Sequence, residues 1–165
     1  MSGQERFVVR TSVNGIVCHV VKYRKDGDIT EVSASSKELH KHGWKAGTGN
    51  LPAAYLTGLL CAVKAKKKKI SKAVLDIGTL NSSGGSRIYA ALKGAVDGGM
   101  NIPHGEEALP DTARVSGKHI VDYASKMKAE DPKAYEKTFT AYLKHNMVPE
   151  HIPEYFEKAK ENIMK

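Results

Sequence analysis

The first third of the chain has the hydrophobic pattern of β-strands. Residues 6–10 and 16–21 are short apolar runs rich in β-branched side chains, and residues 29–34 alternate between apolar and polar. The dipeptides Asn14-Gly15 and Asp26-Gly27 separate the three runs, and both are typical of tight turns between antiparallel strands. The pattern therefore predicts a three-stranded antiparallel meander.

A helical period replaces this pattern after residue 50. Asn50 is a suitable N-cap, and Pro52 is tolerated in a first helical turn. One face of this helix carries the apolar residues Leu51, Tyr55, Leu59 and Ala62. Residues 73–78 then form a buried-strand run that ends in glycine, and residues 88–96 form a second helical period that ends before two glycines.

The rest of the chain predicts a helical tail after a loop at residues 103–112. The expected helices cover residues 115–127, 131–144 and 154–164. The order βββ-α-β-α predicts an α/β fold in which helices pack on a mixed four-stranded sheet. We expect an α/β core at residues 1–112 and a helical C-terminal extension at residues 113–165.

Composition limits the class of protein. The chain has 165 residues, of which 41% are hydrophobic and 27% charged, which is typical of one globular unit. No apolar run is long enough for a membrane span, and the N-terminus lacks the apolar region of a signal peptide. Cys18 and Cys61 both lie in apolar patterns, which argues against a disulfide scaffold. We expect a cytoplasmic protein without a membrane partner.

The positive charge is concentrated in the first half of the chain. Residues 1–72 hold 14 lysines and arginines against 5 acidic residues, whereas residues 73–165 hold 12 against 13. This asymmetry favours a polyanionic partner, and nucleic acid before a membrane. A generic basic module that binds other proteins is the alternative.

Two glycine-containing segments suggest phosphate binding. The segment Asp76-Ile77-Gly78-Thr79 resembles the phosphate loop of actin-like kinases, but the chain has no room for the second lobe of those enzymes. Asp76 is therefore expected to be a local hydrogen-bond acceptor. The loop at residues 81–86 precedes a helix, where free amides and Arg87 suit a phosphate, although a plain N-cap by Ser83 or Ser86 explains the pattern equally well.

The remaining candidates favour RNA binding over catalysis. The seven histidines have no metal-ligand spacing, so neither a metal nor a cofactor is expected. Trp44 could stack on a base, but a place at the edge of the core is the preferred interpretation. The lysines between residues 64 and 72 favour contacts with phosphates.

Several longer strings carry a family resemblance. They are the segments 42–60, 73–78, 85–90 and 101–104. They resemble the 5S rRNA-binding protein of the large ribosomal subunit, number eighteen in the universal series, in its archaeal and eukaryotic form. The resemblance implies a ribonuclease-H-like core without catalysis. It also implies binding to 5S rRNA, attachment to 23S rRNA in the central protuberance, contacts with neighbouring ribosomal proteins, and no homo-oligomer.

Charge, loop chemistry and the resemblance together give the expected RNA-binding residues. They are Arg6, Arg10, Ser12, Asn14, Lys22, Arg24, Lys25, Lys45, Thr48, Asn50, Lys64, Lys66, Lys67, Lys68, Lys69, Ser82, Ser83, Ser86 and Arg87. Two features depart from the family. The family usually begins with an arginine-rich arm, whereas this sequence starts almost at the first expected strand. The first hairpin is also less basic than is usual in the family, and we expect the run Lys64–Lys69 to compensate for the hairpin in part.

Overall fold

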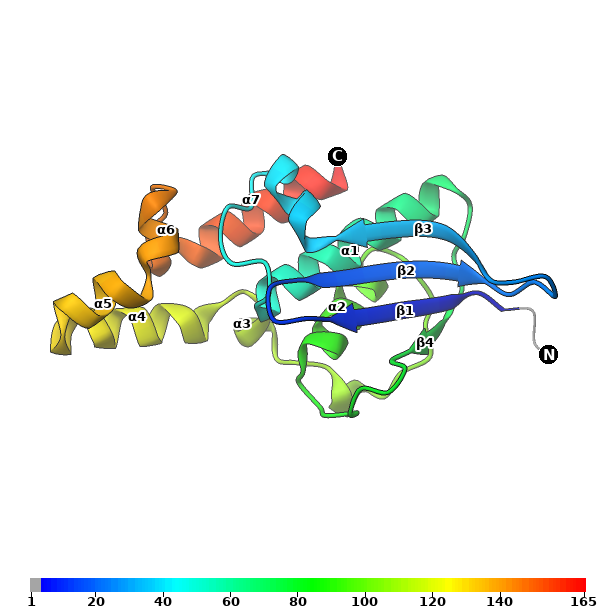
Figure 1. The fold of residues 1–165 in the computed structure, drawn as a ribbon, viewed down its shortest axis with the longest axis horizontal. Coiled ribbons are helices and arrows are strands. Elements are labelled where there is room, and N and C mark those ends of the chain that lie inside the picture. Colours follow the sequence, from blue (N-terminus) through cyan, green and yellow to red (C-terminus); the bar gives the residue numbers. More distant parts are fainter. Residues whose placement is uncertain (1–3) are drawn as a thin grey trace.

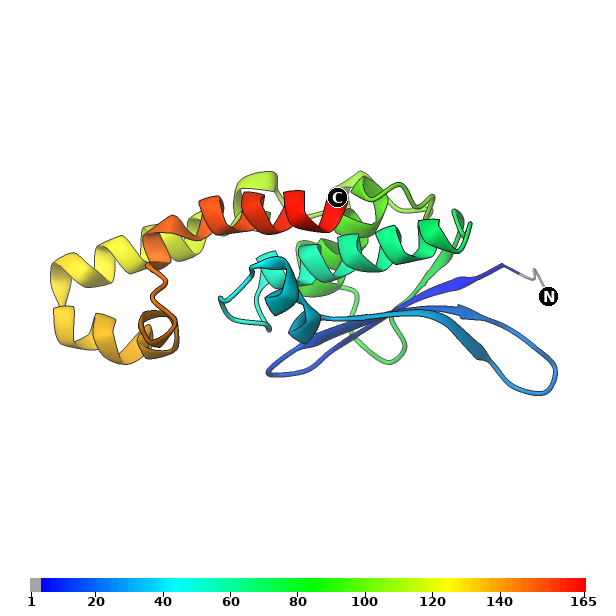
Figure 2. The same cartoon turned by 90° about the horizontal axis from the view of Figure 1, so that it is seen from above.

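A four-stranded sheet with helices on one face forms the centre of the computed structural model, which describes residues 4–165 (Figure 1). The strands are β1 (Arg6–Thr11), β2 (Ile16–Lys22), β3 (Ile29–Ser35) and β4 (Val74–Asp76). Seen from above, the helices lie on one side of the sheet and the other side is uncovered (Figure 2). The fold is therefore the predicted α/β arrangement with a mixed sheet.

The strand order in the sheet is β3-β2-β1-β4. β1 pairs with β2 and β2 with β3 in antiparallel register, as the two turn dipeptides predict. β4 pairs with β1 in parallel, because the chain crosses over through a helix before it returns to the sheet. This strand is only three residues long, so the prediction of a strand over residues 73–78 was too long.

The two helices on the sheet are α1 (Leu51–Lys67) and α2 (Arg87–Asp97). They cross with almost no space between their backbones. A Cβ atom on Gly58 of α1 would lie 1.9 Å from the carbonyl oxygen of Ala91, and one on Gly94 of α2 would lie 2.0 Å from that of Tyr55. Glycine at both positions therefore permits the close approach that closes the core between the helices and the sheet.

A 3₁₀ helix at Ser36–His42 connects β3 to the loop before α1. It begins with a capping box, in which the Ser35 backbone N–H donates to Glu38 and the Lys37 N–H donates to the Ser35 hydroxyl. Trp44 follows and is fully buried. The preferred interpretation of Trp44 as a core residue is thus confirmed, and stacking of its ring on a base is excluded.

The tail differs from its prediction in where its helices break. It contains α3 (Thr112–Val115), α4 (Lys118–Glu130), α5 (Pro132–Thr138), α6 (Thr140–Lys144) and α7 (Ile152–Met164), with 3₁₀ turns at Glu106–Ala108 and Pro149–His151. The helix expected over residues 115–127 is divided because Gly117 adopts φ 90°. The helix expected over residues 131–144 changes direction at Phe139, which caps α5 and precedes α6.

The last helix returns to the centre of the molecule. Ile152, Phe156, Ala159 and Ile163 of α7 are buried, and the Phe156 ring lies 5.3 Å from the Tyr55 ring of α1. In contrast, α4, α5 and α6 project away from the sheet as an arm (Figures 1 and 2). The arm has a small apolar cluster of its own, formed by Ala124, Tyr135 and Phe139.

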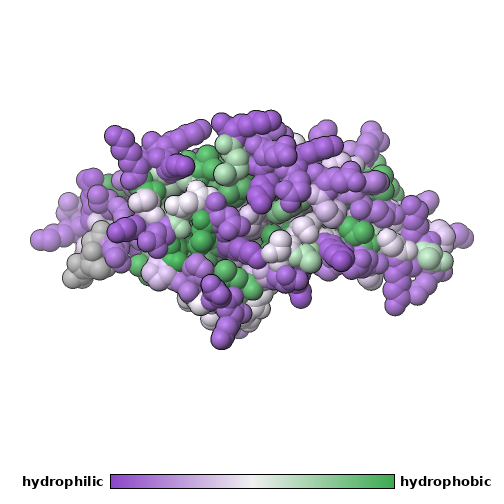
Figure 3. Space-filling view, turned by 180° about the vertical axis from the view of Figure 1, so that it is seen from behind, coloured by the Kyte–Doolittle hydropathy of each residue, from purple (hydrophilic) through white to green (hydrophobic). Residues whose placement is uncertain are grey.

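The side of the molecule that carries the helices is mainly hydrophilic, with separate small apolar areas (Figure 3). Among residues 4–165, no helix has both the length and the apolar composition that crossing a bilayer requires. The same residues contain no group of three or more His, Cys, Asp or Glu side chains that could hold a metal ion. Cys18 and Cys61 are buried free thiols, and burial raises the pKa of Cys18.

Candidate nucleic-acid interface

The expected RNA-binding residues lie in two main groups at opposite ends of the sheet. We call one group the turn end, which comprises residues 11–15, 44–50 and 81–87. The other is the lysine end, which comprises the β2–β3 loop at residues 22–28 and the end of α1 at residues 64–69. Because α1 runs from one end to the other, both groups sit on one rigid unit (Figure 1).

Arg87 holds the turn end together. Its guanidinium donates to the carbonyl oxygen of Ser12 at 2.8 Å and to that of Gly49 at 3.0 Å. The Thr48 hydroxyl adds a hydrogen bond of 2.7 Å to the carbonyl oxygen of Asn14. Segments that are far apart in the sequence are thus fixed side by side, and Ser12 and Asn14 stay exposed at the tip of the hairpin.

Both sheet-covering helices begin at the turn end. The Asn50 carboxamide oxygen caps α1 by accepting from the Ala53 N–H at 2.9 Å, as predicted. Ser86, one of the two serines considered as an N-cap, occupies the N-cap position of α2, but its side chain makes no capping hydrogen bond. The Ser86 hydroxyl and the Asn50 amide nitrogen are both shielded from solvent without a hydrogen-bond partner among the described residues.

The glycine loop before α2 is open and polar. Asn81, Ser82, Ser83 and Gly84 are exposed, and the Ser82 and Tyr89 hydroxyls form a hydrogen bond. Gly85 adopts φ 70°, with no atom within 4 Å of the position that a Cβ would take. The loop is therefore accessible from solvent, although Arg87 beside it already bonds to the chain itself.

Asp76 links two expected RNA-binding arginines on the uncovered side of the sheet. Its carboxylate accepts from Arg6 at 3.0 Å, from Arg10 at 3.3 Å and from the Gly78 N–H at 2.9 Å, and Arg6 also pairs with Asp28. Partial burial acts to raise the pKa of Asp76, but the Gly78 hydrogen bond and the two arginines outweigh it and lower that pKa. The hypothesis that Asp76 is a local hydrogen-bond acceptor is confirmed.

The lysine end contains eight expected RNA-binding side chains, of which two are used within the protein. Lys64 binds Glu38 at 2.6 Å, and Lys68 donates to the carbonyl oxygen of Glu31 at 2.6 Å. Burial acts to raise the pKa of Glu38, but its hydrogen bond with Lys64 and its other partners lower it. The other six of these eight side chains have no ion pair within residues 4–165. They are Lys22, Arg24, Lys25, Lys66, Lys67 and Lys69.

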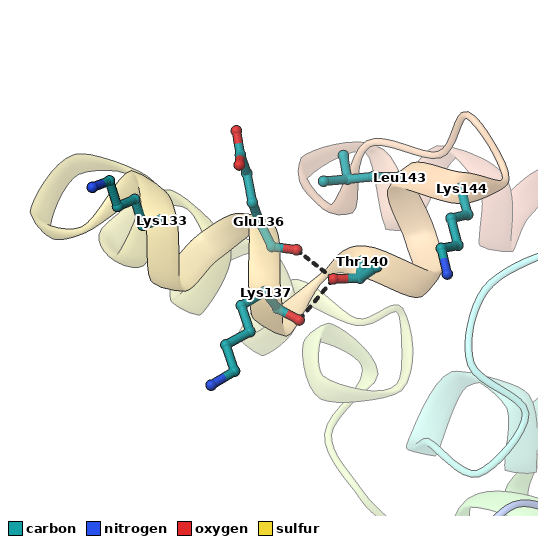
Figure 4. A pocket seen from close by; sticks show the side chains of 6 residues that line it. All are labelled: Lys133, Glu136, Lys137, Thr140, Leu143 and Lys144. Atoms are coloured by element: carbon teal, nitrogen blue, oxygen red, sulfur yellow. Dashed lines mark hydrogen bonds between the residues drawn. The ribbon is translucent and has the colours of Figure 1, made fainter.

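The arm contributes basic side chains that the sequence analysis did not single out. Lys133, Lys137 and Lys144 are among the residues that line an open hollow of about 590 Å³ on α5 and α6 (Figure 4). In this view the carboxylate of Glu136 points away from Lys137 and Lys144. Their sequence signal is weak, because the charges of residues 73–165 nearly balance and the three lysines come from two separate helices.

Comparison with known proteins adds independent evidence. The family described as ribosomal large subunit proteins 60S L5 and 50S L18 matches residues 2–71 and 63–105. The large ribosomal subunit protein uL18 of Methanococcus maripaludis is 47% identical over 164 residues, which cover 99% of this chain and 84% of that protein. The uL18 protein of Methanothermobacter thermautotrophicus is 45% identical over 162 residues, covering 98% of this chain and 83% of that protein.

Proposed function

This chain belongs to the uL18 family of large-subunit ribosomal proteins, in its archaeal form, and from that premise we propose that it binds 5S rRNA and helps to attach it to 23S rRNA. Its role is that of a structural component of the large ribosomal subunit. The proposed location within the subunit is the central protuberance, beside neighbouring ribosomal proteins and without forming a homo-oligomer.

The observation that carries the proposal is the uncompensated charge at the lysine end. Six exposed basic side chains gather there without an ion pair among the described residues. None of the six pairs with Glu31 or Glu38, whose carboxylates are bound by Lys68 and Lys64 instead. When such a surface binds RNA, the release of counterions from the phosphate backbone contributes strongly to the binding free energy.

The expected site residues divide into two roles in this proposal. The six lysines and arginines of the lysine end without an ion pair, together with Lys45 and the exposed atoms of Ser12 and Asn14, contact RNA directly. Thr48, Asn50 and Arg87 shape the turn end, while Lys64 and Lys68 fasten α1 to β3 and its neighbouring 3₁₀ helix.

The remaining expected residues lie at the edge of these two groups. Arg6 and Arg10 are oriented by Asp76 on the uncovered side of the sheet, where Arg10 stays exposed. In the glycine loop, Ser82 and Ser83 are accessible to a phosphate, whereas the Ser86 hydroxyl is shielded from solvent. We propose that the arginines and the two exposed serines extend the RNA contact from the turn end along the sheet, and that Ser86 does not take part.

The two ends suit a bridging function. They are separated by the length of α1, which has 17 residues and is therefore about 25 Å long. One protein surface can thus meet two RNA segments that do not touch each other. We propose that one end binds 5S rRNA and the other helps to hold it against 23S rRNA.

The two alternative functions fit the geometry less well. A phosphate-transferring enzyme would need Asp76 to hold a metal ion, but two arginines and a backbone amide already occupy that carboxylate. A module that binds acidic proteins would use the same lysines, but would not prefer RNA. We therefore propose that the protein has no catalytic activity.

A salt titration of RNA binding tests the proposal. Filter binding with an archaeal 5S rRNA transcript should give a slope of log K against log salt of about −4 to −5, since six phosphate contacts each contribute roughly −0.7 to −0.9. Replacing Lys66, Lys67 and Lys69 by glutamine should reduce that slope by about 2 to 3. Transfer RNA serves as the competitor, and binding that is independent of salt or equally strong for both RNAs would refute the proposal.

A further inference from the structure

A cleft lies where the arm meets the core, between the loop at residues 44–48 and helix α6. It has a volume of about 180 Å³ and brings together side chains from three separate segments. His40 comes from the 3₁₀ helix after β3, Lys45 and Thr48 come from the loop, and Tyr142 and His145 come from α6 and its end.

The lining of the cleft includes three flat rings, those of His40, Tyr142 and His145, and no acidic side chain. Tyr142 is half-buried, and its ring packs edge-on against Phe139 with 5.7 Å between the ring centres, which fixes the plane of the phenol. His40 and His145 are exposed at the rim. Gly47 leaves the space open, because a Cβ atom there would lie 3.2 Å from the Tyr142 hydroxyl.

Positive charge continues from the cleft onto the arm. Lys45 is exposed at the rim, and Lys144 of α6 lines the separate hollow on the arm together with Lys133 and Lys137. Figure 4 shows the Lys144 ammonium directed away from Leu143. None of these lysines has an ion pair among residues 4–165.

We propose that this cleft receives one unpaired nucleobase of ribosomal RNA, and that Lys45 at its rim holds a phosphate next to that base. The inference rests on the proposed RNA-binding function and adds a site outside the two ends of the sheet. Aromatic and imidazole rings are the side chains on which splayed RNA bases stack. The cleft is smaller than the roughly 300–1,000 Å³ of a site for a drug-sized ligand, so it suits a single base carried by a chain.

The arm has a matched control for Tyr142. Tyr123 also lies against Phe139, at 6.5 Å between ring centres, but it is 54% exposed on α4 and does not line the cleft. Replacing either tyrosine by alanine removes a ring that lies against Phe139. Only the Tyr142 change also removes the stacking surface in the cleft.

Affinity for rRNA gives the first test. Tyr142→Ala should weaken binding to the 5S or the 23S rRNA transcript by about 5- to 150-fold, whereas Tyr142→Phe and Tyr123→Ala should stay within about threefold of the parent. His145→Ala, which alters an exposed ring only, should weaken binding in the same direction without lowering the melting temperature. Equal loss in Tyr142→Ala and Tyr123→Ala would mean that the ring only stabilises the arm, and would overturn the proposal.

Zero-length ultraviolet cross-linking of the unmodified protein gives a test that does not depend on folding of a variant. Cross-links should map to peptides that contain Tyr142, His145 or His40, and the transcript that carries them identifies which rRNA supplies the base. If the parent binds rRNA but all cross-links map to other segments, the cleft is not a base site and the proposed function stands. If the parent binds neither transcript, the proposed function itself fails.

Discussion

Replacing Gly58 with alanine should force the two central helices apart. A Cβ at this position would lie 1.9 Å from the Ala91 carbonyl oxygen and 2.7 Å from its carbon, whereas real Cβ atoms keep at least 3.0 Å from such neighbours. The obstacle is backbone and cannot rotate away. α1 and α2 must therefore separate by about 1 Å in a core that is packed as densely as a crystal.

The expected cost follows from two opposing effects. Alanine has a higher helix propensity than glycine by about 1 kcal/mol, which favours the variant. Overpacking of a close-packed core costs about 1–3 kcal/mol and sometimes more, and a contact with backbone belongs at the upper end. We expect a net loss of about 2 kcal/mol in the free energy of unfolding, which corresponds to a melting temperature lower by about 4–8 °C.

Urea unfolding followed by tryptophan fluorescence measures this loss. Trp44 is the only tryptophan and is fully buried, so its emission reports on the core. The control is Gly105→Ala, because Gly105 has φ −88° and no atom within 4 Å of a new Cβ. That variant should match the parent or gain about 0.4–1 kcal/mol. A Gly58→Ala protein that unfolds at the same urea concentration as Gly105→Ala would refute the packing argument.

Three other changes test the site and its support. Arg87→Ala should destabilise the protein by about 1–3 kcal/mol and weaken 5S rRNA binding, since the carbonyls of Ser12 and Gly49 lose a charged donor; thermal melts and filter binding measure both. Because the folded pKa of Asp76 is lowered, its charge stabilises the fold above the unfolded pKa of about 3.9, and that contribution is lost as the pH falls through the folded pKa. Asp76→Asn should therefore lower the free energy of unfolding at neutral pH. In urea melts over a pH series, the variant should also lose less stability than the parent as the pH falls, and an equal loss in both would contradict this. Phe156→Ala should lower the free energy of unfolding by about 3–5 kcal/mol and make α7 susceptible to limited proteolysis. If α7 in this variant resists the protease as well as in the parent, Phe156 does not hold α7 on the core.

The elements that depend on neighbouring residues could be predicted from the sequence. Alternation and the Asn14-Gly15 turn predict β1 and β2, and the Asn50 cap predicts where α1 begins. These signals act over a few residues, because a turn closes within four residues and a cap reaches only to the third residue of its helix. The family resemblance likewise depends on contiguous strings and needs no knowledge of contacts.

The breaks in the tail show the limit of such signals. Apolar spacing indicates a helix on both sides of residue 117, but it does not say that Gly117 adopts φ 90°, which brings it against Ile152 of α7. The short length of β4 is a similar case. Only three of its residues pair with β1, and the chain then turns at Gly78, which adopts φ 62°.

The candidate site depended most strongly on the tertiary structure. Sequence could indicate that Arg87 is a candidate RNA-binding residue, but its guanidinium bonds to Ser12, which is 75 residues away in the chain. The same holds for Tyr142, whose place opposite Gly47 follows from the way α7 turns the arm back toward the core. Charge and composition are sums over the sequence and do not depend on the fold. A contact between distant residues, in contrast, exists only after the core has fixed the distance between them.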